Sequence, residues 1–236
     1  MNSILSAVGL TKTYGGAPAL NNVSIEIPAG GTVGLLGPNG SGKSTFIKLA
    51  MGLLQPTSGE IFIDGKRPGV ETKRMTAYLP DTNFLTDWMT VGQMMDYCAD
   101  FFDDFSKEKA RAMLSRLSIS EKQRVRALSK GNKEKVGLIL TMARDARLYI
   151  LDEPIAGVDP AARDYILDTV FSNRAPDSTV ILCTHLIYDV QNVLTQAIFL
   201  YNGTIALNAN VADLCEKEGK PLDEIFKEMF RWSPNY

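Results

Sequence analysis

Cysteine and surplus positive charge are both scarce in this sequence. The chain of 236 residues has three cysteines, Cys98, Cys183 and Cys215, which lie far apart and form no C-x-x-C pair. This spacing favours neither a disulfide framework nor a zinc site, and it fits reduced thiols in a cytosol. The 25 Lys and Arg residues are balanced by 27 Asp and Glu residues, which gives a formal net charge of −2. Because a nucleic-acid-binding surface usually needs a clustered excess of Lys and Arg, we expect no nucleic acid as a partner.

Long hydrophobic runs, export signals and internal repeats are also missing. The longest apolar runs cover residues 148–151 and 197–201, which is far short of the ~20 residues that span a bilayer. Residues 1–6 show no basic segment followed by an apolar stretch, so nothing marks the chain for export. We therefore expect that the protein stays where it is made and that another chain supplies the membrane part of any membrane process. The 45% hydrophobic content is ample for one domain with an inserted subdomain.

Hydrophobic periodicity predicts a strand-rich first third and then a helical insertion. Alternating or short apolar runs predict strands at residues 4–10, 20–27, 32–36, 60–63 and 75–79. Between residues 81 and 143 the apolar residues recur at helical spacing, and Ser106 and Ser129 are placed to begin helices. An α-helical insertion is therefore predicted there.

The last third alternates strands with helices. Apolar runs predict strands at residues 148–151, 179–183 and 197–201, separated by helices at 160–174 and 186–194. This alternation indicates βαβ crossovers and a parallel sheet covered on both faces. Two short amphipathic helices are predicted after it, at residues 211–217 and 222–230.

A glycine-rich loop lies between the predicted strand at 32–36 and a predicted helix. Its pattern, G-x-x-x-x-G-K-[ST], wraps backbone N–H groups around a polyphosphate, with Lys43 reaching the outer phosphates and the Ser44 hydroxyl completing a Mg²⁺ shell. The helix that follows aims its unpaired donors and positive dipole end at the same anion. The alternative, a loop that merely turns the chain, is disfavoured by the strand before it and the helix after it. The loop consists of Gly37, Pro38, Asn39, Gly40, Ser41, Gly42, Lys43, Ser44 and Thr45.

Two carboxylates follow the predicted strand at 148–151. Ligands of open α/β sheets bind outside the carboxyl ends of the strands, which is where Asp152 and Glu153 would lie. Asp152 fits the role of holding Mg²⁺ opposite Ser44. Glu153 points elsewhere and can polarise a water for in-line attack on a γ-phosphate. The alternative, two acids that merely cap a strand, is disfavoured by the phosphate loop.

In these motifs and their order the chain resembles the ATP-binding subunit of an ABC transporter, over essentially its full length. Residues 128–132 resemble the LSGGQ signature, and residues 156–159 resemble the D-loop. The resemblance implies that Tyr14 stacks on adenine and that His185, the single histidine, contacts the γ-phosphate. It also implies that Ser129 and Gly131 complete the ATP site of a facing subunit and that Asp159 lies across the dimer interface.

Two departures from the family pattern bear on the site. Asp81 stands where the family usually has a glutamine, and a carboxylate can still ligate Mg²⁺ or its waters. In the signature, Lys130 replaces a glycine and Asn132 a glutamine. Lysine cannot relax the backbone as glycine does, but its ammonium adds favourable charge near facing phosphates. Because Ser129 and Gly131 are retained, we expect an active site.

The fold implied by the resemblance is an α/β P-loop NTPase of the RecA-like type. It has a mostly parallel sheet, an N-terminal antiparallel β subdomain and an inserted α-helical subdomain. Residues 1–236 then form a single ABC ATPase domain. Within it, 1–80 and 144–208 are the ATP-binding core with the antiparallel subdomain, 81–143 the helical subdomain and 209–236 a short C-terminal helical tail.

The function implied by the resemblance is Mg²⁺-dependent ATP hydrolysis coupled to transport, with Glu153, His185 and Lys43 as the catalytic residues. Two subunits, either two copies of this chain or this chain with a similar ATPase subunit, would close over two ATP molecules and pull on a polytopic membrane subunit. The site of action would be the cytoplasmic face of a bacterial cell membrane. The short tail, Asp81 and the signature variant resemble ABC-2-type exporters of bacitracin-like compounds, antimicrobial peptides or phenol-soluble modulins. The expected cargo is therefore a peptide, an antimicrobial compound or another amphipathic substrate.

Two other classes of function stay open. A soluble ABC ATPase acting on ribosomes or nucleic acid usually has two ATPase halves, a long coiled-coil insertion or a basic face, and the sequence shows none of these. A nucleotide-sensing module would bind ATP without turnover. The presence of Glu153 argues against this alternative, because a module that does not hydrolyse ATP would not need a general base.

Overall fold

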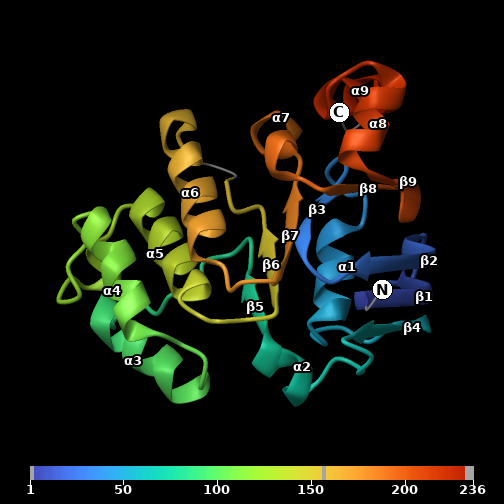
Figure 1. Ribbon diagram of the computed structural model, residues 1–236. Helices are drawn as coiled ribbons and strands as arrows, with labels where there is room; N and C mark the ends of the chain where they lie inside the picture. Colours follow the sequence, from blue (N-terminus) through green and yellow to red (C-terminus); the bar gives the residue numbers. More distant parts are fainter. Residues whose placement is uncertain (1–2, 156–157, 232–236) are drawn as a thin grey trace.

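The strands form two sheets that lie next to each other (Figure 1). The computed structural model describes residues 3–155 and 158–231. The smaller sheet is antiparallel, in the order β2 (Pro18–Pro28), β1 (Ser3–Thr13) and β4 (Ser58–Ile63). The larger sheet has the order β5 (Thr76–Leu79), β6 (Leu148–Asp152), β7 (Thr179–Thr184), β3 (Gly31–Leu36), β8 (Gln196–Tyr201) and β9 (Thr204–Asn210). Its first five strands are parallel and β9 is antiparallel, so the predicted fold class is confirmed.

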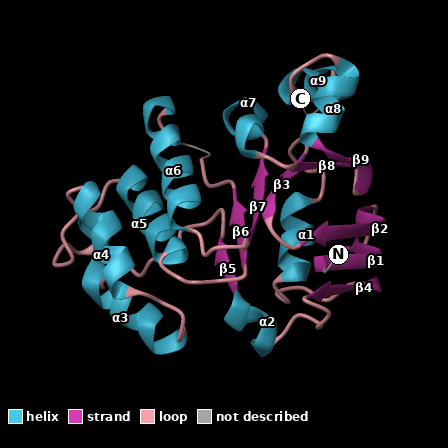
Figure 2. Cartoon of the chain, viewed as in Figure 1, coloured by secondary structure: helices cyan, strands magenta, loops and turns pink. Residues whose placement is uncertain are grey.

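Three helices form a group at the β5 side of the larger sheet, and the others lie around the rest of the sheet (Figure 2). Those of the helical subdomain are α3 (Val91–Phe101), α4 (Lys107–Arg116) and α5 (Lys130–Met142). The others are α1 (Lys43–Ala50), α2 (Val70–Met75), α6 (Pro160–Asn173), α7 (Ile187–Val190), α8 (Val211–Glu218) and α9 (Leu222–Phe230). Short 3₁₀ helices cover Val125–Ala127 and Gln191–Val193.

The larger sheet has a separate hydrophobic core on each face. On one face α1 lies between the two sheets, and Phe46 and Ile47 pack with alternate residues of the central strands. On the other face the helical subdomain and the C-terminal helices pack against residues such as Tyr149 and Phe199. Because a parallel sheet is covered on both faces, its strands are continuous buried runs, as the sequence predicted.

Side-chain caps begin the helices of the inserted subdomain. The Thr90 hydroxyl accepts from the Gln93 N–H at 3.2 Å, and the Gln93 amide oxygen accepts from the Thr90 N–H at 2.9 Å, which is a reciprocal capping box before α3. Ser106 and Ser129 cap α4 and α5, as predicted. Each such cap contributes about 1 kcal/mol of helix stability.

The buried Arg144 joins the helical subdomain to the core. Its Nε donates to an Asp104 carboxylate oxygen at 2.8 Å, and its Nη1 donates to the Thr76 carbonyl oxygen at 2.7 Å. Asp104 lies between α3 and α4, whereas Thr76 begins β5. The guanidinium therefore fixes the inserted helices to the edge of the larger sheet.

The structure differs from the sequence prediction at four places. The helix predicted over 186–194 is the single turn of α7 followed by a 3₁₀ turn, and the helical insertion begins with a loop up to residue 90. Helix α2 and strand β9 were not predicted. Asn202 and Gly203 join β8 to β9 with φ values of 46° and 75°, as a two-residue hairpin turn requires. An Asn-Gly pair between apolar runs was the sequence signal for that hairpin.

Candidate active site

The glycine-rich loop connects β3 in the centre of the larger sheet to the N-terminus of α1. A Cβ on Gly37 would lie 2.2 Å from the Leu200 carbonyl oxygen, so no larger residue fits there. Gly42 has φ 108°, and its Cβ would lie 2.5 Å from the Ala19 carbonyl oxygen. Gly42 also occupies the N-cap position of α1 with no side-chain cap. The first N–H groups of the helix are therefore left to bind an anion.

The Lys43 side chain folds back toward the first residues of the loop. The side chain is buried, and its ammonium donates to the Gly37 carbonyl oxygen at 2.7 Å and to the Pro38 carbonyl oxygen at 3.1 Å. The Ser41 hydroxyl is also buried and has no hydrogen-bond partner among the residues that the structure describes. A buried ammonium beside an unpaired hydroxyl and free helix N–H groups fits the phosphate chain of a nucleotide.

The β8–β9 turn supports the loop from the far end of the chain. The Gly203 N–H donates to the Ser41 carbonyl oxygen at 3.0 Å, and the Gly203 carbonyl oxygen accepts from the Asn21 N–H at 2.8 Å. This contact was not predicted, because it depends on a strand that the sequence analysis missed.

Asp152 ends β6 beside β7 and is the most deeply buried acid of the site. Its relative exposure is 1%, and within residues 3–155 and 158–231 neither carboxylate oxygen accepts a well-formed hydrogen bond, since the nearby Cys183 thiol is only a weak donor. Burial raises the pKa of Asp152, and the charges of Asp81 and Glu153 add to this, whereas the Cys183 thiol and Lys43 act in the opposite direction. A buried carboxylate without a partner is costly, so this position fits a cation.

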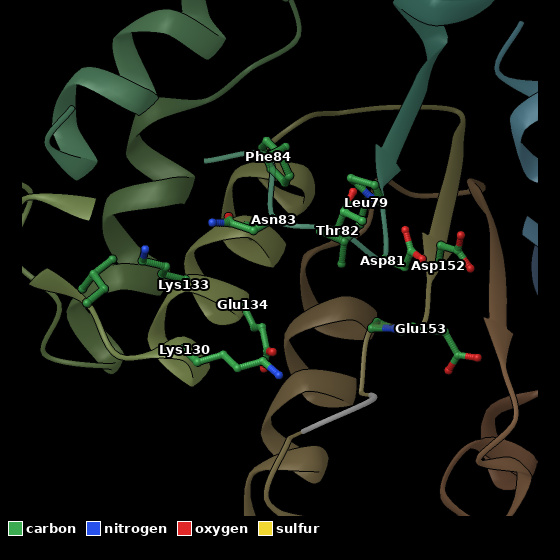
Figure 3. Close-up of a pocket in the computed structure, with 14 residues that line it drawn as sticks. Leu79, Asp81, Thr82, Asn83, Phe84, Lys130, Lys133, Glu134, Asp152 and Glu153 are labelled. Carbon is green, nitrogen blue, oxygen red and sulfur yellow. The ribbon is translucent and has the colours of Figure 1, made fainter. Parts of the chain in front are cut away.

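Glu153 points in a different direction from Asp152 (Figure 3). Its backbone has φ 51°, a left-handed conformation that costs a non-glycine residue about 1–2 kcal/mol. One carboxylate oxygen lies 2.9 Å from His185 Nδ1, and the other accepts from the Thr184 hydroxyl at 3.1 Å. The Glu153 N–H donates to the Cys183 carbonyl oxygen at 2.7 Å. Glu153 and His185, each predicted as a catalytic residue, are therefore in contact.

Thr184 is a residue of the site that was not predicted. Its hydroxyl accepts from the Leu186 N–H at 3.1 Å, which leaves its own hydrogen for the Glu153 carboxylate. The side chain is fully buried at the end of β7. Its place directly before the single histidine, at the carboxyl end of a predicted parallel strand, was the available signal.

A pocket of about 360 Å³ lies between the acids and the helical subdomain (Figure 3). Asp152 and Glu153 line it at the end of β6, Asp81 lines it just after β5, and Lys130 and Glu134 line it from α5. The structure thus brings Asp81, predicted as a metal ligand, next to Asp152. It also places Lys130 of the signature across the same pocket.

Other predicted residues lie away from this group. Tyr14 is exposed in the turn between β1 and β2, with the Lys12 ammonium 5.4 Å from its ring centroid. Ser129 caps α5 and accepts from the Asn132 N–H at 3.3 Å, and Gly131 is exposed on the same helix. Asp159 is exposed. Residues 156 and 157 of the D-loop pattern lie outside the described residues.

The ABC transporter family profile matches residues 20–156. The ABC-type transporter ATP-binding protein EcsA of Bacillus subtilis is 30% identical over 96% of this chain and 96% of its own length. The SkfA peptide export ATP-binding protein SkfE of the same organism is 28% identical over 98% of each chain. The chain spans only 58% of the length of an uncharacterized ABC transporter ATP-binding protein of Synechocystis, to which it is 28% identical over 83% of its residues.

A solved structure of an ATP binding subunit of an ABC transporter has the same fold. It superposes with a TM-score of 0.84 and 29% identity, over 96% of this chain and 99% of that chain. Across residues 3–155 and 158–231, helices of the length and apolar character needed to span a bilayer are not found.

Proposed function

The chain belongs to the ABC transporter family of ATP-binding proteins, which hydrolyse ATP, and we propose that its hydrolysis drives export through a separate membrane-spanning subunit. One observation carries the site assignment. The phosphate loop, Asp152, Glu153 and His185 all lie at the carboxyl ends of β3, β6 and β7, which are neighbours in one parallel sheet. Open α/β sheets bind their ligands at that edge.

In this proposal the loop residues from Gly37 to Thr45 hold the phosphates of ATP, with Lys43 at the outer ones. Mg²⁺ would be held by Ser44, Asp152 and Asp81, where it neutralises charge on the phosphates. Within the described ranges, no group of three or more His, Cys, Asp or Glu side chains is arranged so that it could hold a metal ion without other ligands. That agrees with how proteins hold Mg²⁺, through one or two carboxylates together with substrate phosphates.

Glu153 is positioned to act as the general base. Its carboxylate takes a proton from the attacking water as the water oxygen bonds to the γ-phosphorus and the bond to the ADP oxygen breaks. Thr184 and His185 hold that carboxylate by its two oxygens. Of Thr184 and His185, it is His185 that contacts the γ-phosphate in this proposal.

The remaining site residues fit a composite site made by two subunits. We assign Tyr14 to adenine stacking, and Ser129, Gly131 and Asp159 to the ATP site of a facing subunit, which is a second copy of this chain or a similar ATPase. Gly131 supports this, because it is exposed on α5 and nothing lies within 4 Å of where its Cβ would be. We also propose the domain division expected from the sequence, with 81–143 as the helical subdomain. The protein would work at the cytoplasmic face of the membrane.

A groove of about 320 Å³ fits a helix of the membrane subunit. It lies between the core and the helical subdomain and is lined mainly by apolar atoms, with Leu53, Tyr78 and Phe102 among its residues. Near it, Tyr97 and Phe101 are exposed on α3, with ring centroids 4.7 Å apart. Exposed aromatic pairs of this kind are typical of interfaces. The cargo class that we propose, peptides or other amphipathic compounds, follows the peptide export named for SkfE.

Two experiments test this function. Glu153→Gln should keep ATP affinity and abolish hydrolysis, whereas Glu108→Gln on the exposed first turn of α4 should change neither. An unchanged hydrolysis rate in Glu153→Gln would contradict the assignment of Glu153 as the general base.

The second experiment tests the partner. Affinity purification of this protein from detergent-extracted cells should recover a polytopic membrane chain. Recovery of ribosomes in its place would overturn the transporter proposal.

A further inference from the structure

His185 begins a short segment that depends on its neighbours for its position. Residues 185–193, which we call the switch segment, connect β7 to β8 through α7 and a 3₁₀ turn. The His185 side chain is 41% exposed, and its Nδ1 contacts the Glu153 carboxylate. A side chain this exposed receives little support from packing. Its orientation therefore depends on how firmly the backbone of the switch segment is held.

Helix α6 holds the switch segment from one side through an ion pair. Arg163 Nη1 lies 2.8 Å from an Asp189 carboxylate oxygen, and both side chains are 22% exposed. The Arg163 Nε donates to the Val158 carbonyl oxygen at 3.3 Å. One guanidinium thus links α7 to the loop that begins with Glu153. A partly buried, directional pair of this kind fixes geometry better than a surface pair.

Helix α9 holds the same segment from the other side. The Asp223 N–H donates to the Gln191 amide oxygen at 3.3 Å. Phe226 is 2% exposed and packs edge-to-face on Phe199 of β8, with ring centroids 5.2 Å apart. In Figure 1, α9 lies beside α7 and α8 at the end of the larger sheet, and α7 and α9 are in contact.

An open surface pocket of about 290 Å³ lies between these two supports. It is lined by His185 and Ile187 of the switch segment, by Arg163 of α6 and by Phe226 of α9. Because this pocket is open, the switch segment is not enclosed by packing there and relies on the contacts on both sides.

We propose that Arg163, Asp189 and helix α9 are positioning elements that hold His185 against Glu153 and thereby set the rate of hydrolysis. This inference rests on the proposed role of His185. The ion pair fixes α7 relative to the loop after β6, and α9 fixes the end of the switch segment relative to β8. Loosening either one moves the imidazole, and a misplacement of about 1 Å at a reacting group costs up to ~10²-fold in rate.

The ion pair is tested with Arg163→Ala, Asp189→Ala, the double variant and the exchange Arg163→Asp with Asp189→Arg. Each single variant should lower kcat about tenfold with KM for ATP within twofold, since positioning is lost but binding is kept. The double variant should be no slower than the single ones, and the exchange should restore part of the rate. Lys107→Ala, which removes a 2.7 Å ion pair with Asp96 in the helical subdomain, is the matched control and should keep the rate. If the losses in kcat of Arg163→Ala and Asp189→Ala instead multiply in the double variant, the two residues act independently and the proposed role of their ion pair is wrong.

The single histidine gives a readout that does not depend on turnover. The ring signals of His185 can be followed by ¹H–¹³C NMR without assignment ambiguity. They should shift in Arg163→Ala and in Phe226→Leu, and stay unchanged in Lys107→Ala and in Met229→Leu, since Met229 is exposed on the same helix as Phe226. If an alanine variant does not fold, Asp189→Asn can replace it, because this variant removes the charge of Asp189 but keeps the size of the side chain.

The two proposals fail in different ways. Unchanged His185 signals in Arg163→Ala, Asp189→Asn and Phe226→Leu would overturn the positioning role even if Glu153→Gln behaves as expected. Shifted signals with wild-type kcat would also overturn it, because the rate would not depend on the position of the imidazole. An unchanged rate in Glu153→Gln would instead overturn the catalytic assignment.

Discussion

Replacing Asp152 by asparagine should stabilise the isolated protein while it removes the added stability that Mg²⁺ and ATP confer. The carboxylate is 1% exposed and, in the part of the chain that the structure describes, accepts no well-formed hydrogen bond. An unsatisfied buried polar group costs about 1–3 kcal/mol, and a charged one costs more. Lys43 and the Cys183 thiol offset part of this cost. An amide of the same shape carries no charge to desolvate, so we expect a gain of roughly 1–2 kcal/mol.

The sign of the pH dependence follows from the direction of the pKa shift. Burial raises the pKa of Asp152 above its ordinary value. Between the two pKa values the folded protein binds more protons than the unfolded chain, so this group makes stability fall as pH rises. The penalty is absent below the ordinary aspartate pKa of about 3.9 and fully present above the raised one. Asp152→Asn should therefore gain most near neutral pH and nothing in strong acid.

Thermal and urea unfolding at neutral pH measure this gain. For a chain of this size, 1 kcal/mol corresponds to roughly 2–4 °C in Tm. A ligand at 100 times its Kd adds about 2.7 kcal/mol, and wild type should show such an increase with Mg²⁺ and ATP, whereas Asp152→Asn should show little. Asp103→Asn, at an exposed aspartate, is the control and should change neither quantity. If Asp152→Asn is less stable than wild type without nucleotide, the desolvation reasoning is wrong.

Three further variants test contacts around the site. Thr184→Val removes the hydroxyl that holds Glu153, so steady-state kinetics should show kcat lowered about tenfold with KM kept, and an unchanged kcat would exclude the anchoring role. Gly203→Ala places a Cβ 2.8 Å from the Ala19 carbonyl oxygen at φ 75°. Urea unfolding should show a loss of about 2 kcal/mol, with weaker ATP binding because the brace on Ser41 is distorted, and wild-type affinity would show that the turn does not support the loop. Lys43→Met should fold but lower ATP affinity more than tenfold in calorimetry, since the ammonium is lost from the loop; normal binding would refute its assignment.

The phosphate loop and the two acids could be predicted because their chemistry is local in sequence. A loop of fixed length between a strand and a helix needs glycine where the backbone approaches other atoms, and Gly37 and Gly42 both meet that condition. Asp152 and Glu153 directly follow a buried strand, so their place at the edge of the sheet followed from the strand alone.

Contacts that depend on register or subdomain packing could not be predicted in the same way. Thr184 reaches Glu153 because Asp152 pairs with Cys183, which places the residue after the end of β6 next to the last residue of β7. Asp81 and Lys130 line one pocket because the inserted helices pack against the sheet, which periodicity alone does not specify. Helix α2 has six residues, too few for a helical period to appear in the sequence.

The central position of β3 has a consequence for synthesis. Its hydrogen-bonded neighbours are β7 and β8, which begin at Thr179 and Gln196. At ~5–20 residues per second, the ribosome takes roughly 7 to 30 seconds to go from the end of β3 to the start of β7. During that interval the apolar strand β3 has been synthesised but β7 and β8 have not, so the phosphate loop that follows β3 cannot yet adopt its folded conformation. A translational pause between β3 and β7 would prolong this exposure, whereas a pause after β8 would fall when both neighbours have been synthesised.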